Sequence, residues 1–156
     1  MKKLLLLLLV FSLCLGGCGL NEGTVTYTYE DLTIRIPEGY LELSGEDYAE
    51  DLTFLFGRDP VAVNGLREEK ATFEAHGLKL DLKSYGALLL QSNNVLGTLQ
   101  KKNGIYTFSY EAGDLTYVAT LYETDTAFWT VQAYCPTAKY NKLKNALWDI
   151  LSSVTV

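Results

Sequence analysis

The chain is poor in the residues that carry most catalytic and metal-binding chemistry. Its 156 residues include one histidine, three cysteines, one methionine and three prolines. A single histidine excludes a multi-histidine metal centre, and the sequence holds no zinc-protease, phosphate-loop, serine-hydrolase or paired-cysteine redox motif. Two of the cysteines stand in the first twenty residues, so Cys135 has no obvious disulfide partner. We therefore expect a domain held by its apolar core, with no enzymatic activity and no cofactor.

Long apolar runs are also scarce, and the one that exists stands at the N-terminus. Two lysines precede the run Leu4–Leu15. At 1.5 Å per residue such a run spans roughly 18 Å, well short of the ~30 Å hydrocarbon core of a bilayer. A basic start, a short apolar run and small residues after it are typical of an export signal. Cys14 and Cys18 cannot form a four-ligand zinc site by themselves, because no further ligand stands near them.

The segment Leu15-Gly16-Gly17-Cys18 resembles the bacterial lipobox. The resemblance implies that residues 1–17 are a lipoprotein signal peptide and that Cys18 is the lipid attachment site, joined by a thioether to diacylglycerol with palmitate-type chains. Two acyl chains anchor a protein stably where one is marginal. Residues 18–24 would then be a short tether, and we expect the protein at the cell membrane, on its extracytoplasmic side. A secretory signal without lipid remains the alternative.

Charge excludes one class of partner. Without Lys2 and Lys3, 11 basic residues face 19 acidic ones, a net charge of −8. Such a chain is not drawn to nucleic acid, and we expect its charge to repel it from anionic lipid. The remaining length suits one domain, which we assign to residues 25–156.

Patterning predicts a mixed fold. Strands are predicted where β-branched and aromatic residues alternate, and helices where apolar residues recur at helical spacing. Asp81 is the expected N-cap of the first helix, and the second carries the stripe Tyr140, Leu143, Leu147, Ile150 and Leu151. The predicted strands are 25–30, 32–36, 52–56, 61–69, three runs within 105–135, and 154–156; the predicted helices are 82–91 and 137–151.

The three runs within 105–135 predict two successive hairpins. The first turn is expected to place Phe108 opposite Tyr117. For the second hairpin, a two-residue loop would set Tyr122 beside Trp129 and Ala119 beside Gln132, whereas a three-residue loop would set Leu121 opposite Trp129, Ala119 opposite Val131 and Leu115 opposite Cys135. We prefer the three-residue loop, because it separates an apolar face from a threonine-rich one. It also buries the Cys135 thiol.

The threonine-rich face is the candidate binding surface. Hydroxyl and aromatic groups on a flat sheet suit a peptide, a sugar or a small ligand. The residues that we assign to it are Tyr122, Phe128, Thr130, Gln132 and Tyr134. A packed helix or plain solvent over the same face is the competing interpretation. His76 is interpreted as a surface residue, and the acidic run 46–51 lacks the ligand spacing of a calcium loop.

The order of predicted elements resembles the PsbP-like superfamily, which includes a photosystem II extrinsic protein and a Ran-binding factor. The segments that carry this resemblance are "LTIRIPEGY", "LDLKSYGALLLQSN", "GIYTFSYEAGDLTYVATLYET" and "FWTVQAYCPTAKYNKLKNALWDILSSVTV". It implies an α+β fold, an α/β/α sandwich with two main helices around a central antiparallel sheet. Because folds do not carry function, the expected role is a non-enzymatic lipoprotein domain for protein interaction or envelope assembly. The alternative is a receptor for a small molecule or metal ion.

Overall fold

The computed structural model describes residues 23–43 and 51–156. Nine strands form a two-stranded hairpin, β1-β2, and a seven-stranded antiparallel sheet in the order β3-β4-β5-β9-β8-β7-β6. The strands are β1 (Thr24–Tyr29), β2 (Leu32–Pro37), β3 (Leu41–Glu42), β4 (Leu52–Arg58), β5 (Val61–Glu69), β6 (Gln100–Lys102), β7 (Ile105–Ala112), β8 (Leu115–Glu123) and β9 (Ala127–Pro136). The helices are α2 (Lys70–Ala75), α3 (Leu82–Ser92) and α4 (Thr137–Leu151).

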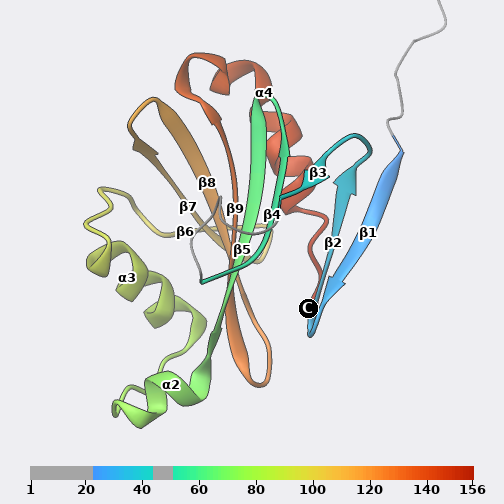
Figure 1. Ribbon diagram of the computed structural model, residues 1–156. Helices are drawn as coiled ribbons and strands as arrows, with labels where there is room; N and C mark the ends of the chain where they lie inside the picture. The colour runs from blue at the N-terminus through green and yellow to red at the C-terminus, as the bar shows by residue number, and fades with distance from the viewer. Residues whose placement is uncertain (1–22, 44–50) are drawn as a thin grey trace, which may run out of the picture.

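The sheet is covered on both faces (Figure 1). Helix α4 and the β1-β2 hairpin lie against one face, and α2 and α3 lie against the other. The larger core cluster joins the hairpin, the sheet and α4, and includes Trp129, Phe54 and Leu147. The smaller cluster joins α3 to the sheet around Tyr85 and Phe128. The predicted α+β sandwich is therefore confirmed, with the hairpin as an additional part of the α4 layer.

Both main helices form where their sequence patterns predict them. The Asp81 carboxylate accepts a hydrogen bond from the Ser84 backbone N–H at 2.7 Å and begins α3. Gly86 lets α3 lie close to the sheet, because a Cβ there would stand 2.6 Å from a methyl group of Leu121. Helix α4 follows Pro136 directly, and its apolar stripe packs on the larger cluster.

The predicted register of the three-stranded meander is wrong in both hairpins. Between β7 and β8, Tyr110 rather than Phe108 stands opposite Tyr117, because the turn lies at Gly113-Asp114. Between β8 and β9, Tyr122 pairs with Trp129, which is the register of a two-residue loop and not of the predicted three-residue loop. The predicted pairs Leu121–Trp129, Ala119–Val131 and Leu115–Cys135 do not form; Ala119 pairs with Gln132.

Burial on both faces explains this error. Trp129, Val131, Ala133 and Cys135 face α4 and the hairpin, whereas Phe128 and Thr130 face α3, and all six are buried. The register was predicted by assuming that β9 has one buried apolar face and one exposed polar face. That assumption selects the wrong register, since β9 has no exposed side over this stretch. Cys135 is buried as predicted, but beside Thr116 rather than Leu115.

Short elements complete the sheet. The predicted last strand, 154–156, is reduced to one bridge between Thr155 and Thr33 of the hairpin. Asn103-Gly104 forms the turn between β6 and β7, with both residues at positive φ. The sequence pattern did not predict α2, β3 or β6, whose lengths of 6, 2 and 3 residues hold too few positions for a period.

One polar cluster fastens the hairpin to the sheet. The Trp129 indole N–H donates to Asp31 Oδ1 at 2.8 Å, and Arg67 Nε lies 3.3 Å from the same oxygen. Arg67 also pairs with Glu30 and Glu69 and donates to Thr126. Burial alone would raise the Asp31 pKa, but hydrogen bonds from Thr124, Arg67 and Trp129 outweigh it and lower the pKa to about 2.

Replacing the Asp31 carboxylate should loosen the hairpin. Asp31→Asn is expected to lower the free energy of unfolding by about 1–3 kcal/mol at neutral pH, because it leaves the Arg67 and Trp129 donors without their anion. The lowered pKa stabilises the fold above pH 3.8, and this contribution is lost as the pH falls through about 2. Urea unfolding across this range should show the difference from wild type shrinking with acid. Asp125→Asn, on the exposed β8-β9 turn, is the control, and an equal loss in both variants would contradict the role of Asp31.

Candidate functional site

The structure divides the predicted binding surface between the two faces of the sheet. Phe128, Thr130, Gln132 and Tyr134 follow one another at alternate positions of β9 and share the α3 side. Tyr122 lies on the opposite face, where its hydroxyl donates to the Leu151 backbone oxygen at 2.7 Å. Assigning Tyr122 to the binding surface is therefore wrong, and the cause is the register error in the second hairpin.

Helix α3 covers the half of this surface nearest the β8-β9 turn. The Tyr85 ring stacks on Phe128, with centroids 4.5 Å apart and planes 11° apart. The Tyr85 hydroxyl donates to Glu68 Oε2 at 2.5 Å and lies 2.9 Å from Thr130 Oγ1. Phe128 and Thr130 are consequently buried. The competing interpretation, a packed helix, is correct for these two residues.

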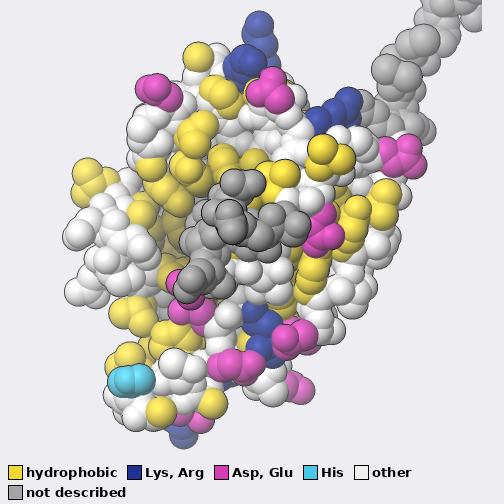
Figure 2. Space-filling view, in the orientation of Figure 1, with side chains coloured by type: hydrophobic (Ala, Val, Ile, Leu, Met, Phe, Trp, Pro, Cys, Tyr) yellow, Lys and Arg dark blue, Asp and Glu magenta, His cyan; other side chains and the backbone are white. Residues whose placement is uncertain are grey.

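The other half of the surface carries a row of stacked tyrosines. Tyr110, Tyr117 and Tyr134 occupy one register line across β7, β8 and β9. Their ring centroids lie 4.8 Å and 4.6 Å apart, with neighbouring planes at 5° and 26°. All three side chains are half-buried. The same line continues over Ala62 and Gly57 to Leu41, which is 68% exposed. We call Tyr110, Tyr117 and Tyr134 the tyrosine row. Figure 2 shows hydrophobic side chains gathered above α3 on the face turned to the viewer.

A cleft of about 530 Å³ lies between the tyrosine row and the C-terminal end of α3. Its apolar floor comes from Leu66, Leu89 and Phe108, and the exposed Asn93 and Asn94 stand at its rim. On the sheet side of the cleft, the Tyr110 hydroxyl donates to Gln132 Oε1 at 3.4 Å. Ligand pockets commonly have this size and an apolar floor with a few polar groups. Two residues predicted from sequence, Thr130 and Gln132, therefore line a real cleft.

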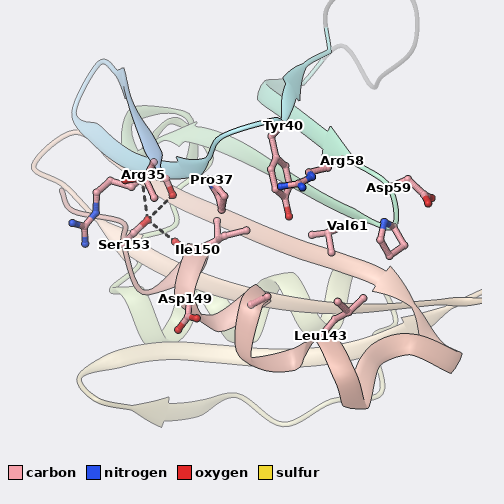
Figure 3. A pocket seen from close by; sticks show the side chains of 13 residues that line it. Arg35, Pro37, Tyr40, Arg58, Asp59, Val61, Leu143, Asp149, Ile150 and Ser153 are labelled. Atoms are coloured by element: carbon pink, nitrogen blue, oxygen red, sulfur yellow. Dashed lines mark hydrogen bonds between the residues drawn. The ribbon is translucent and has the colours of Figure 1, made fainter. Parts of the chain in front are cut away.

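A second cleft, of about 600 Å³, lies between α4, the hairpin and the β4-β5 turn (Figure 3). Pro37, Val61, Leu143 and Ile150 supply its apolar walls, and Tyr40 and Arg58 stand at its edge. The Arg35 side chain points away from it, while the Arg35 backbone N–H donates to Ser153 Oγ at 3.0 Å. No residue of the predicted binding surface lines this cleft, because its lining comes from three segments far apart in the chain.

The remaining sequence predictions concern metals, acids and the membrane. His76 lies exposed at the end of α2, with Nδ1 2.8 Å from the Thr72 backbone oxygen. Within residues 23–43 and 51–156, no group of three or more His, Cys, Asp or Glu side chains is placed to hold a metal ion. No helix in the same ranges has both the length and the apolarity needed to cross a bilayer. Cys18, the signal peptide 1–17, most of the tether 18–24 and most of the acidic run 46–51 lie outside the described residues.

Solved structures with the same architecture identify the fold. Cyanobacterial PsbP (CyanoP) from Synechocystis sp. PCC 6803 matches with a TM-score of 0.64 and 13% identity, over 92% of this chain and 99% of that one. A point mutant of protein Mog1 matches with a TM-score of 0.51 and 12% identity, over 87% of this chain and 96% of that one. The fold is thus PsbP/Mog1-like, and at this identity the likeness shows the fold alone. No protein-family model and no curated protein sequence matches the chain.

The tyrosine row should titrate as a coupled unit. Burial raises the pKa of Tyr110, Tyr117 and Tyr134 above 10.0, and the charge of ionised Tyr117 raises the pKa of both its neighbours further. Because the folded state holds these protons more tightly, its stability is full below pH 10 and falls as the pH rises further. Tyr117→Phe is expected to shift the remaining tyrosinate absorbance of the row to lower pH, whereas Tyr140→Phe on α4 leaves it in place. An unchanged curve in Tyr117→Phe would contradict the coupling.

Proposed function

We propose that this protein is an extracytoplasmic lipoprotein anchored through Cys18, whose domain binds a protein partner without catalysing a reaction. The observation that carries the binding role is the tyrosine row beside the 530 Å³ cleft. The lipobox-like segment Leu15–Cys18 carries the anchoring role. The two parts are independent, because the first rests on the fold and the second on the N-terminal sequence.

Tyrosine side chains suit a binding surface for a physical reason. They offer a large amphipathic contact area at a small entropic cost, and they are enriched at the centres of protein interfaces. In the tyrosine row each ring is held by its neighbour at 4.6 to 4.8 Å, so a partner would not have to order them. A tyrosine ring is apolar and its hydroxyl is polar, which lets one surface accept both apolar and hydrogen-bonding groups.

The absence of catalysis is proposed from the groups that line the cleft beside the tyrosine row. Amides and hydroxyls line the polar edge of the cleft beside the tyrosine row, together with the exposed carboxylate of Glu111. His76, directly after α2, is the cyan side chain at the lower left of Figure 2 and lines neither cleft. These groups suit recognition by hydrogen bonding better than proton transfer.

A small-molecule receptor is the second candidate, and the cleft itself favours it. The floor of Leu66, Leu89 and Phe108 would accept an apolar group, and Gln132 with Asn93 would fix a polar end. Protein binding is preferred because the tyrosine row extends beyond the cleft, across β8 and β9 toward Ala62 and Leu41. A ligand confined to the cleft would leave most of that row uncovered.

The anchor predicts a defined chemical modification. Protein purified from its own membranes should have its N-terminus at Cys18 and a mass increased by diacylglycerol. Cys18→Ser should abolish both changes, whereas Cys14→Ser should change neither. A mature protein with an unmodified Cys18 would refute this part of the proposal.

The binding surface predicts where a partner can be captured. A photo-crosslinking amino acid at Tyr134 or Tyr117 should give one discrete crosslinked species in cells, and the same group at Tyr140 on α4 should not. Replacing both Tyr110 and Gln132 by alanine should lower the yield at Tyr134 at least about tenfold, the effect of losing one strong interface contact.

Other results distinguish the two candidate functions. Equal crosslinking at Tyr134 and Tyr140 would contradict a partner on the tyrosine row. Thermal stabilisation by a small metabolite, lost in Gln132→Ala and accompanied by no crosslinked species, would favour the receptor instead. The Tyr110 and Gln132 side chains are only half-buried, so their replacement should leave the fold intact.

A further inference from the structure

The solvent side of α4 carries most of its charge as lysine. Lys139, Lys142 and Lys144 are exposed, and Asp149 is the one carboxylate on the helix. Strand β6 adds a fourth lysine to the same side of the sheet, because the Lys102 ammonium lies 4.0 Å from the centroid of the Trp148 ring. We call Lys102, Lys139, Lys142 and Lys144 the lysine face. Lys101 is not part of it, since it lies over Tyr106 on the other side of the sheet.

Helix α4, which carries three of these lysines, lies next to the point where the chain enters the fold. Thr24, the first residue of β1, lines the same cleft as Leu143, Ala146 and Asp149 of α4. Figure 1 shows β1 and α4 on the same side of the sheet. Cys18 precedes Thr24 by six residues, which span at most roughly 20 Å when fully extended. A lipid on Cys18 would therefore hold the bilayer surface within reach of α4.

The charges closest to the bilayer decide whether the domain is attracted to it or repelled by it. The mature chain carries a net charge of −8, which would repel an anionic bilayer if all its charges acted together. Salt screens charges beyond roughly 8–10 Å, so only the side chains turned toward the lipid count. Helix α4 and Lys102 together carry four lysines against Asp149, the opposite sign from the chain as a whole, whereas the hairpin beside them carries Glu30, Asp31 and Glu38 against Arg35. Arg58 and Asp59, which have opposite charges, stand at the neighbouring cleft.

We propose that the lysine face docks on the anionic headgroups of the membrane that holds the lipid anchor. This inference rests on the proposed anchoring at Cys18. Each lysine near an anionic surface adds to the attraction, and the anchor removes the entropic cost of bringing the domain there. The tyrosine row lies on the opposite side of the sheet from α4 and so remains open to a partner.

Lysine acetylation on vesicles tests this orientation. The lipidated protein is reconstituted into vesicles of phosphatidylcholine, with or without phosphatidylglycerol, and treated with a reagent that does not cross membranes. Mass spectrometry then gives the rate at each lysine. The four lysines of the lysine face should react at least about fivefold more slowly on the anionic vesicles, and high salt should abolish the difference. Lys79 and Lys83, near the start of α3, should react alike on both and correct for protein inside the vesicles.

Charge reversal supplies the matched variants. Replacing Lys139, Lys142 and Lys144 by glutamate should remove the protection of Lys102, whereas Lys79→Glu with Lys83→Glu should preserve it. Equal rates on both kinds of vesicle, or the same protection on phosphatidylcholine alone, would overturn the inference. A protein that does not float with the vesicles would instead refute the anchor, so failure of the inference and failure of the proposed function are distinguishable.

Discussion

The fold depends on the burial of β9 on both faces. Trp129, Val131, Ala133 and Cys135 project into the larger core, while Phe128 and Thr130 project under α3. A strand with two buried faces needs a layer on each, and the α/β/α sandwich meets that need. The polar edge of Trp129 is satisfied only because the hairpin brings Asp31 to it from the other layer. The position of the hairpin thus follows from the position of β9.

The same constraint explains which parts of the fold the sequence predicts. Helices α3 and α4 were predictable because each has a single apolar stripe, such as Leu147 and Ile150 on α4. The register of the β7-β8-β9 meander was not predictable. Alternate residues of β9 point to two different buried layers, so the alternation does not distinguish buried from exposed side chains. A threonine such as Thr130 reads as polar in the sequence, yet in the fold its hydroxyl bonds to Tyr85 and it belongs to the core.

The candidate site was predictable only in part. Gln132 and Tyr134 were assigned correctly to one face, because they alternate along one strand whatever its partner. Their relation to Tyr110 and Tyr117 required the true register, in which the three rings fall on one line. Neither cleft could be seen in the sequence, since each is closed by residues from a helix and from strands distant in the chain. The sequence shows which secondary structure each segment prefers, but it does not show which distant segments come together to form a cleft.

The net charge of the chain does not show how its charges are distributed over the surface. An acidic chain is expected to avoid anionic lipid, and the sequence supports only that expectation. The fold sorts the charges, because α4 packs Leu143, Leu147 and Ile150 against the core and leaves Lys139, Lys142 and Lys144 exposed. The amphipathic helix that packs on the sheet thus also carries more lysines than carboxylates on its exposed surface. If α4 faces the membrane in the tethered domain, the tyrosine row on the other side of the sheet faces away from it. The packing of α4 would then also set the direction in which the tyrosine row meets a partner.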